Sequence, residues 1–194
     1  VSRCLYYCSV VIYIFKQKLL GFHMKTTLGF TLTEMVVTTT ILSIIVAFAI
    51  PAFHHLLASW ESNQTIRILT MNIQKAKIDA QIYHKNVIIC PSQDLESCHN
   101  DWNKGFISFI DSNKNRQRDN DETLLFASTL NHKYGSLSYR GFGSSPRYVI
   151  FQQENGLPFA SNGSFIYCSN SLDDHSKLVI GRMGHPRFEK TPTC

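Results

Sequence analysis

A continuous apolar stretch from Met35 to Phe53 constrains the fold of this chain more than any other feature of its sequence. Every residue in the stretch is apolar or small except three threonines. A helix of that length, at about 1.5 Å per residue, reaches roughly the 30 Å thickness of a bilayer core. The sequence therefore predicts a helix that can span a membrane.

One carboxylate, that of Glu34, lies directly before the apolar stretch. Burying an unpaired charge at this depth is costly, so a carboxylate here is a candidate functional residue with a partner elsewhere. The alternative is an ordinary signal-anchor helix whose carboxylate lies at the level of the lipid headgroups.

A short basic leader precedes the stretch. Residues Met24 to Gly29 read MKTTLG, Phe30 follows, and Pro51 lies near the end of the apolar run. With Glu34 five positions after the glycine, this pattern resembles the class III signal and N-terminal helix of type IV pilins and pseudopilins. The resemblance implies that a prepilin peptidase cleaves after Gly29, that Phe30 is N-methylated, and that Glu34 acts in filament assembly. The new amine of one subunit is a cation, and the Glu34 carboxylate of a neighbour can pair with it inside an apolar bundle.

The first 23 residues do not fit this scheme, because they put a second hydrophobic stretch ahead of the cleavage site. We therefore expect translation to begin at Met24, which would leave Cys4 and Cys8 outside the protein; a genuine long leader is the alternative. Residues 1–29 hold four of the nineteen Lys and Arg and none of the fourteen Asp and Glu. Cleavage would lower the formal net charge from +5 to +1, so net charge does not point to a polyanionic partner.

These boundaries predict three parts: a leader region at residues 1–29, a membrane and filament helix at residues 30–58, and a periplasmic globular domain at residues 59–194. Between His54 and Asn86 there is no Gly or Pro, and apolar residues recur at spacings of three and four, which predicts that the helix continues as an amphipathic helix. The predicted buried stripe is Ile66, Leu69, Ile73, Ala76, Ala80 and Tyr83.

Beyond Asn86 the sequence changes to short β-like runs separated by turns. The predicted strands are Val87 to Cys90, Phe106 to Asp111, Thr123 to Ala127, Ser136 to Tyr139, Tyr148 to Gln152, Ser164 to Cys168 and Lys177 to Gly181. One long helix followed by seven short strands predicts the α+β class, with the helix packed on a small antiparallel β-sandwich.

Four cysteines remain after cleavage: Cys90, Cys98, Cys168 and Cys194. Their even number, in a domain expected to face the oxidising periplasm, favours two disulfides over a metal site. Of the three possible connectivities, Cys90 with Cys98 and Cys168 with Cys194 is preferred because it joins neighbours in sequence. A zinc site made by the four cysteines is the alternative, but no CxxC spacing supports it.

The region that reads ICPSQDLESCHNDWNKGFISFIDSNKNRQRDNDETLLF carries a second resemblance. Its Cys-Pro start, second cysteine, Trp102, Gly105, Phe-rich strand and Asp-x-Asn-x-Asn series from Asp111 are similar to the GspH/FimT group of minor pilins and pseudopilins. The two resemblances together cover most of the mature chain. The same residues also have a structural interpretation, in which aromatic side chains fill the core and the Asn/Asp-rich residues form a hairpin loop.

The same region contains a candidate calcium loop. Five residues with side-chain oxygens stand at the EF-hand positions that hold the ion: Asp111, Asn113, Asn115, Asp119 and Glu122. Arg116 stands where the turn of an EF-hand requires Gly, and both Arg116 and Arg118 are placed to neutralise the acids directly. A solvated hairpin loop without a metal is the alternative.

The C-terminal segment KLVIGRMGHPRFEKTPTC resembles part of a motif. FimT proteins linked to natural transformation carry Gly-Arg-x-Arg near their C-terminus, and the best match here starts at Gly184. In this register His185 replaces the first arginine of the motif, and Arg187 matches the second. A competing register from Gly181 keeps Arg182 and loses the second arginine. Either register keeps only part of the motif.

Local charge nevertheless favours a phosphate-binding surface in this segment, where basic residues outnumber the single Glu189. Arginine can donate two hydrogen bonds to one phosphate, and such contacts bind duplex DNA weakly and without sequence preference. The predicted DNA-binding residues are Lys177, Arg182, His185, Arg187, Lys190, Arg140 and Arg147, with Lys133 beside them. A solvated strand and tail is the alternative.

The sequence holds no Gly-x-Ser-x-Gly motif, phosphate-binding loop or helical histidine pair of the metal-binding type. We therefore expect a protein that is not an enzyme and needs no cofactor. The predicted function is that of a minor type IV pilin of the FimT type, which assembles into the pilus tip and contributes to DNA uptake in natural transformation. The alternatives are a GspH-like pseudopilin of a type II secretion system and a purely structural pilus-priming subunit without a ligand.

The predicted partners follow from this function. Before assembly the helix would cross the bacterial inner membrane once, with the C-terminal domain in the periplasm. The expected protein partners are the prepilin peptidase, other major and minor pilins, and the assembly platform of the inner membrane. Duplex DNA is the expected ligand.

Overall fold

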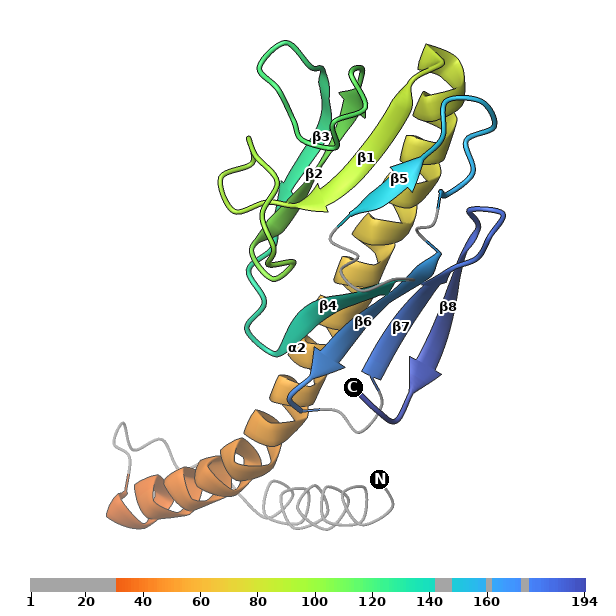
Figure 1. Ribbon diagram of the computed structural model, residues 1–194. Coiled ribbons are helices and arrows are strands. Elements are labelled where there is room, and N and C mark those ends of the chain that lie inside the picture. The colour runs from red at the N-terminus through yellow and green to blue at the C-terminus, as the bar shows by residue number, and fades with distance from the viewer. Residues whose placement is uncertain (1–30, 142–147, 160–161, 172–174) are drawn as a thin grey trace. The chain divides into compact units, whose positions relative to one another are not determined.

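The structure, a computed structural model, describes residues 31–141, 148–159, 162–171 and 175–194. In these segments one α-helix, α2 (Leu32–Tyr83), is followed by eight β-strands. Two compact units divide the chain, residues 1–46 and residues 47–194. The second unit holds the C-terminal part of α2 and all eight strands (Figure 1).

Local sequence explains where α2 begins and ends. Thr31 caps the first turn, since its hydroxyl and its carbonyl oxygen both accept the Glu34 N–H, at 3.3 and 3.0 Å. No glycine interrupts the 52 residues of the helix, which continues through Pro51. It ends at Tyr83, and His84 then adopts a left-handed conformation with φ of 50°.

From Ala58 onward α2 buries one face. The buried side chains recur at short helical spacings and are Ala58, Ser62, Thr65, Ile66, Leu69, Asn72, Ile73, Ala76 and Ala80. The predicted apolar stripe is confirmed from Ile66 to Ala80. It is wrong at Tyr83, whose side chain is 50% exposed because the helix ends there and the chain turns into the first strand.

The strands form two antiparallel four-stranded sheets. Sheet A has the order β3-β2-β1-β5, and sheet B has the order β4-β6-β7-β8. Their bounds are β1 (Asn86–Pro91), β2 (Gly105–Asp111), β3 (Leu124–Thr129), β4 (Gly135–Gly141), β5 (Val149–Phe151), β6 (Gly163–Ser169), β7 (His175–Ile180) and β8 (Pro186–Thr191). The predicted α+β class, with a long helix packed against antiparallel sheets, is confirmed (Figure 1).

Strand β8 is the element that the sequence pattern does not predict. Its sequence PRFEKT holds three charged residues, and four of its six positions are exposed. It forms an edge of sheet B beside β7. An edge strand that buries few side chains does not need to alternate apolar and polar residues. Pro186 at its first position is compatible with an edge strand, since a missing N–H there removes no interior ladder bond.

Both sheets share one hydrophobic core with α2. Leu69 and Ile73 of the helix belong to the same buried cluster as Phe106 of sheet A and Phe165 of sheet B. Trp102, from the loop before β2, packs its ring edge-on against Phe165, with 4.8 Å between ring centroids. A second, smaller cluster holds Ile88 and Phe109 of sheet A with Leu95 and Cys98 of the loop after β1. This loop therefore covers the face of sheet A that does not contribute to the main core.

A polar network around Glu61 joins α2 to sheet B. The Glu61 carboxylate accepts hydrogen bonds from the N–H groups of Lys133 and Tyr134, at 3.0 and 3.1 Å, and from the Tyr167 hydroxyl, at 2.6 Å. Burial alone would raise the pKa of Glu61, but these hydrogen bonds outweigh it and lower the pKa. Nδ1 of His132 lies 3.6 Å from the same carboxylate. Burial lowers the pKa of His132, against the opposing pull of Glu61.

Candidate functional site

The first part of α2 is apolar and exposed. Every residue from 31 to 56 is exposed except Ile41, which is half-buried. An 18-residue stretch of the helix has a mean hydropathy of 2.3, and none of it is buried. By length and composition the helix can cross a membrane, which agrees with the predicted span.

The hydroxyl groups in this part of α2 are satisfied inside the helix. Thr39 donates to the Met35 carbonyl at 2.8 Å, and Thr40 donates to the Val36 carbonyl at 2.9 Å. Ser43 donates in the same way to a carbonyl three residues earlier, at 2.8 Å. A polar group that is already bonded within its helix adds little cost in lipid or in a bundle of helices. The threonines therefore do not oppose either environment.

Glu34 lies in the first turn of α2, where a negative charge interacts favourably with the helix dipole. The two ion pairs found among the described residues involve other acids, Asp94 and Glu61. The Glu34 carboxylate thus has no ion-pair partner within the described part of its own chain. Gly29 and Phe30, the predicted cleavage and methylation residues, lie outside the described residues.

Several predicted DNA-binding residues lie on sheet B. Along β7, Leu178 and Ile180 are buried in the core, so Lys177 between them points to the opposite, outer face of the sheet. On β8, Arg187 pairs with Val179, which alternates with the same buried residues. Arg187 therefore lies on the outer face as well.

Arg140 lies on this outer face at the other edge of sheet B. The strand register places Arg140 opposite Ser164, Ser164 opposite Val179, and Val179 opposite Arg187. The two arginines thus end one row that crosses four strands, a span of about 14 Å at roughly 4.8 Å per strand spacing. The guanidinium of Arg140 donates to the Cys194 carbonyl at 2.6 Å, which helps to hold its side chain in place.

The positive side chains that share the outer face define a surface that we call the basic face: Arg140, Lys177 and Arg187. Glu189, which the register places opposite Lys177, adds one acid to it. Lys190 is not part of the basic face, because it pairs with Ser176, which is buried on the side of the sheet that faces the core. Successive residues of a strand point to opposite faces of the sheet, so the basic residues Arg187 and Lys190, which are close in sequence, lie on opposite faces of β8.

Two further basic residues do not extend the basic face. Lys133 lies in the loop before β4, where its N–H binds Glu61. Arg147 lies outside the described residues. Within the part of the chain that the structure describes, the basic face therefore unites three predicted side chains, and the turn between β7 and β8 carries Arg182 and His185 beside it, both exposed.

Gly184, in the turn between β7 and β8, has a structural role of its own. It is buried with φ of 71°, and a Cβ atom there would lie 3.2 Å from the ring of Pro158. Glycine suits this position because it adopts positive φ freely and needs no space for a side chain. Lys77 of α2 also donates to a carbonyl of the turn, that of Met183, at 2.8 Å. The glycine of the partial Gly-Arg-x-Arg match is thus required by packing.

Two disulfides join Cys90 to Cys98 and Cys168 to Cys194, which is the connectivity that the sequence favours. The first closes the loop that covers one face of sheet A. The second attaches the C-terminal segment to β6, on the outer side of sheet B, since the neighbouring Tyr167 faces the core.

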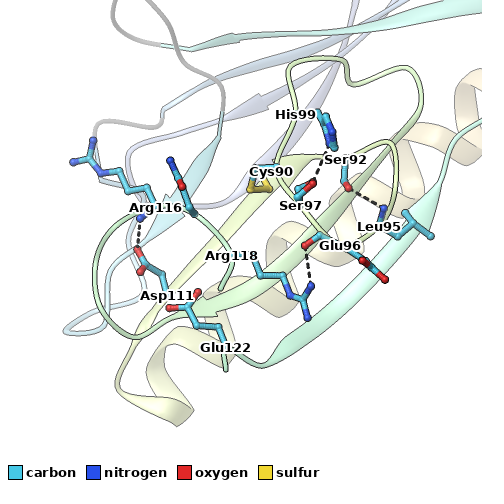
Figure 2. The surroundings of a disulfide bond; sticks show 12 residues. Cys90, Ser92, Leu95, Glu96, Ser97, His99, Asp111, Arg116, Arg118 and Glu122 are labelled. Atoms are coloured by element: carbon cyan, nitrogen blue, oxygen red, sulfur yellow. Dashed lines mark hydrogen bonds between the residues drawn. A yellow bond between two sulfur atoms is a disulfide. The ribbon is translucent and has the colours of Figure 1, made fainter. Parts of the chain in front are cut away.

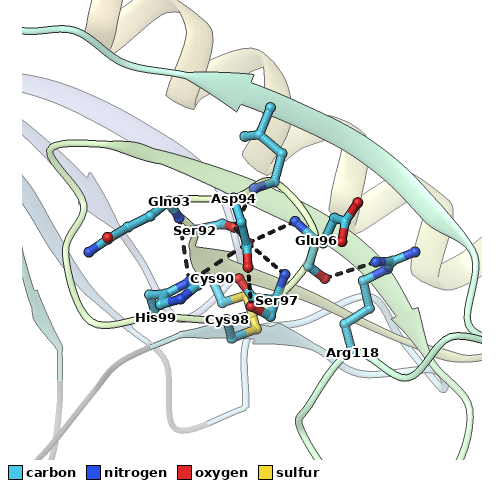
Figure 3. Close-up of polar contacts among 10 residues, drawn as sticks. Cys90, Ser92, Gln93, Asp94, Glu96, Ser97, Cys98, His99 and Arg118 are labelled. Atoms are coloured by element: carbon cyan, nitrogen blue, oxygen red, sulfur yellow. Dashed lines mark hydrogen bonds and ion pairs between the residues drawn. A yellow bond between two sulfur atoms is a disulfide. The ribbon is translucent and has the colours of Figure 1, made fainter.

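Asp94 organises the loop closed by the first disulfide (Figure 3). Its carboxylate accepts the Ser97 hydroxyl at 2.6 Å, the N–H groups of Glu96 and Ser97 at 2.9 Å each, and the Ser92 hydroxyl at 2.9 Å. These hydrogen bonds, led by that of the Ser97 hydroxyl, hold the pKa of Asp94 well below its usual range. The loop is therefore folded by its own side chains as well as by the disulfide.

The predicted calcium loop connects β2 to β3, and two of its acids, Asp111 and Glu122, turn inward (Figure 2). Asp111 is 2% exposed and Glu122 is 5% exposed. Glu122 accepts the Ser112 N–H at 2.8 Å and the Asp119 N–H at 3.3 Å, while Asp111 accepts the Arg116 N–H at 3.3 Å. These two carboxylates are therefore packed into the protein and are not part of a solvated hairpin.

Arg116 and Arg118 do not neutralise these acids, so this part of the prediction is wrong. Arg116 donates to the Tyr148 hydroxyl at 3.2 Å. Arg118 donates to the Glu96 carbonyl at 2.8 Å (Figures 2 and 3). Both arginines line a cavity of about 390 Å³ beside the Cys90–Cys98 disulfide. The physical reason is that both guanidinium groups are bonded to groups outside the loop, those of Tyr148 and Glu96.

The sequence pattern does not identify Glu61 as a structural residue, because it places Glu61 on the solvated side of the helix. Its partners Lys133 and Tyr167 are 72 and 106 residues away. No local spacing signals contacts between such distant parts of the chain. The available sign was that Glu61 is the one acid between Glu34 and Asp79 in the sequence.

Comparisons with known proteins agree with this architecture. The profile of the family described as Type II transport protein GspH matches residues 65–184, which include β1 to β7. The type IV minor pilin FimU of Pseudomonas aeruginosa has a similar solved structure, with a TM-score of 0.52 and 18% identity over 66% of this chain and 88% of that chain. The minor pseudopilin EpsH from the type 2 secretion system of Vibrio cholerae aligns with a TM-score of 0.47 and 9% identity over 66% of this chain and 96% of that chain. No curated protein matches the chain.

More than half of the chain thus matches one family profile, over the region that forms the core. The long apolar helix and the two antiparallel sheets also reproduce the fold of FimU. The chain therefore belongs to the GspH family of minor pilins and pseudopilins.

Proposed function

We propose that this protein is a minor pilin of a type IV pilus, of the FimT kind, that assembles at the pilus tip and is not an enzyme. The observation that carries the proposal is the exposed apolar part of α2, residues 31–56, which precedes a packed domain formed by the described residues from Ala58 onward. An apolar helix of this length needs lipid around it before assembly and other apolar helices around it afterwards.

Glu34 supplies the specificity of assembly in this proposal. Cleavage after Gly29 frees the amine of Phe30, which is a cation at the start of an apolar helix. Neither this amine nor the Glu34 carboxylate is stable alone in an apolar bundle, but the two form a pair when a neighbouring subunit brings them together. The absence of an ion-pair partner for Glu34 within the described part of its own chain supports this role.

The assembly proposal is tested by Glu34→Gln in cells that make the pilus. We expect the variant protein to remain folded in the inner membrane and to be lost from sheared filaments. Thr33→Ser, one residue earlier on the same exposed turn, is the matched control and should assemble normally. Mass spectrometry of the wild-type protein should find a methylated Phe30 at the N-terminus. An uncleaved leader in cells with an active peptidase, or normal assembly of Glu34→Gln, would refute the assignment.

DNA binding is the second part of the proposal, and the basic face is the surface that we assign to it. Arg140 and Arg187 lie about 14 Å apart by strand spacing, which is close to the roughly 12 Å width of the DNA major groove. The two arginines can therefore reach phosphates on both sides of one groove, with Lys177 between them. Contacts of this kind carry affinity without base recognition, which suits the uptake of DNA of any sequence.

The alternative is a pseudopilin that builds the tip of a type II secretion pseudopilus. Deletion of the gene separates the two functions. We expect deletion to reduce DNA uptake and to leave exoprotein secretion unchanged, and complementation with a chain in which Arg140 and Arg187 are both replaced by Gln should restore assembly without restoring full uptake. Loss of secretion with unchanged DNA uptake would establish the pseudopilin role instead.

A further inference from the structure

We propose that the loop between β2 and β3 binds a calcium ion. The proposed ligands are Asp111, Asn113, Asn115, Asp119 and Glu122. The observation that points to a cation is Asp111, which is 2% exposed and whose Oδ1 is buried without a hydrogen-bond partner among the described residues. A carboxylate oxygen that is buried with neither a donor nor a cation is costly, so this atom needs a partner that the described part of the chain does not supply.

The Asp111 carboxylate faces the interior of the loop. Its Oδ2 accepts the N–H of Arg116 at 3.3 Å, and Arg116 lies at the middle of the loop. Asp111 also borders a cavity of about 220 Å³, which Asn86 and Glu154 line with it.

A second and a third carboxylate lie in the same loop. Glu122 accepts the Ser112 N–H and the Asp119 N–H, so its two oxygens connect the start and the end of the loop. Among the described residues, ion pairs within 4.0 Å are found at His99 and at His132, and neither involves these acids. None of these three carboxylates therefore has a neutralising side chain in the described part of the chain.

The basic residues near the loop bind elsewhere. Arg116 donates to Tyr148, Arg118 donates to the Glu96 carbonyl, and Lys85 donates to the Ser112 hydroxyl at 3.0 Å. Lys114 and Arg116 border the cavity at Asp111, so their charge opposes the approach of a cation. These contacts predict that the site binds a cation weakly. They also mean that the basic side chains bind other groups and do not take the place of the ion.

Asn113 and Asn115 have to complete the site. Both side-chain amides donate to Oδ2 of Asp119, at 2.7 Å each. No three His, Cys, Asp or Glu side chains of the described segments surround a common point, so binding requires the loop to close around the ion. It also requires the two amides to turn their carbonyl oxygens toward the ion and away from the N–H groups of Asn115 and Gln117, from which they accept hydrogen bonds. Calcium prefers six to eight oxygens from carboxylates, carbonyls and water in a flexible arrangement, and the five ligands with added water meet this requirement.

The backbone of the loop already has the bend that an EF-hand needs. Arg116, at the position that an EF-hand fills with Gly, has φ of 65°. A non-glycine residue is disfavoured in this region, so the surroundings hold it there. Because the hydrogen bonds of two amides are lost on binding, we expect a dissociation constant of about 10⁻⁴ to 10⁻³ M, the range of extracellular calcium modules.

Thermal unfolding of the full chain in a neutral detergent tests the proposal. Calcium at about ten times the expected dissociation constant should raise the unfolding midpoint by about 3 °C. Magnesium should raise it less, because Mg²⁺ demands a stricter geometry and keeps its waters. Calorimetric titration with CaCl₂ measures the affinity independently.

Variants locate the site. Asp119→Asn and Asp111→Asn should each abolish the calcium-dependent shift, whereas Asp121→Asn, which removes an exposed acid of the same loop, should keep it. If Asp111→Asn does not fold, Asp119→Asn decides. Arg116→Gly should tighten calcium binding several-fold, since it relieves the left-handed conformation and removes a positive charge. A wild-type chain without a calcium shift, or equal shifts in Asp119→Asn and Asp121→Asn, would overturn the proposal, and neither result bears on the pilus assignment.

Discussion

The two parts of α2 are one continuous helix, but they differ in what surrounds them. Residues 58–83 place nine side chains in contact with the core. Residues 31–57 contain no buried side chain, although they are the more apolar part. Intrinsic helix formation is therefore common to both, whereas tertiary packing stabilises only the second. The burial that the first part needs has to come from lipid or from other subunits.

This difference separates residues that hold the fold from residues that are left for partners. A fully buried Leu or Ile side chain contributes about 1.5–3 kcal/mol relative to an exposed one. Large exposed side chains in the first part, such as Leu42, Ile45 and Phe48, contribute nothing comparable within their own chain. The outward side chains of the basic face are also residues that are left for partners, since they too contribute little to the core.

The largest expected effect is that of Ile73→Ala. Ile73 is 0% exposed, so truncation removes buried surface and leaves a cavity, which should lower the free energy of unfolding by about 2–5 kcal/mol. Ile45→Ala, the same change in the first part of α2, should leave it unchanged. Denaturant unfolding of both variants in detergent, followed by near-UV circular dichroism of the domain, measures the difference. Equal destabilisation by the two changes would contradict the difference between the two parts of α2, since it would mean that the first part of the helix also supports the fold.

A smaller effect is expected at the two acids of the helix. Glu61→Gln replaces a charged acceptor of three hydrogen bonds, and it should lower the free energy of unfolding by about 2 kcal/mol. Glu34→Gln should not alter it, since the described residues give this carboxylate no bonded partner. The same unfolding measurement tests both changes. Destabilisation by Glu34→Gln would show that this residue has a role in the fold.

The Glu61 network also predicts a dependence of stability on pH. Since burial lowers the pKa of His132 in the folded state, the unfolded chain takes up a proton that the folded chain does not, and stability falls as the pH drops below about 6.5. The lowered pKa of Glu61 adds a second loss near pH 4, because the unfolded carboxyl is protonated first.

Unfolding midpoints measured between pH 7.5 and pH 5 test the histidine step. His132→Phe should flatten the dependence in this range, because it removes the group and keeps an aromatic ring beside Tyr167. His55→Phe, at an exposed position of α2, is the control and should retain the slope. An unchanged slope in His132→Phe would assign the effect to another group.

The features that could be predicted from the sequence are those that local patterns of residues determine, and the features that were missed depend on contacts between distant parts of the chain. The continuous apolar run predicts the membrane span, and local periodicity predicts the buried stripe from Ile66 to Ala80, because burial on one face of a helix leaves a repeating pattern. It does not predict β8, whose edge position requires no apolar alternation, or the network of Glu61, whose partners come from distant loops. The direction of a side chain on a strand is also lost when charge is counted along the sequence, which is why Lys190 is grouped with Arg187 although the two lie on opposite faces.

The smallest expected effect concerns DNA, and it separates the basic face from the net charge of the C-terminal segment. The full chain in a neutral detergent should bind duplex DNA at micromolar or weaker affinity, and with about three phosphate contacts the affinity should fall with salt at a log-log slope of about −3. Arg187→Gln should reduce this slope by about one and leave the unfolding midpoint unchanged, because Arg187 is exposed.

Lys190→Gln is the matched control for Arg187→Gln, since it removes the same charge from the same strand on the opposite face. We expect it to leave the salt slope unchanged. His185→Arg, in the turn beside the basic face, should increase the slope, because it adds a permanent positive charge. Fluorescence anisotropy with labelled duplexes at several salt concentrations measures each slope. If Lys190→Gln and Arg187→Gln weaken binding equally, the charge of the whole segment binds DNA and the sheet face does not; if no binding occurs at low salt, the outward side chains of sheet B serve contacts with other subunits alone.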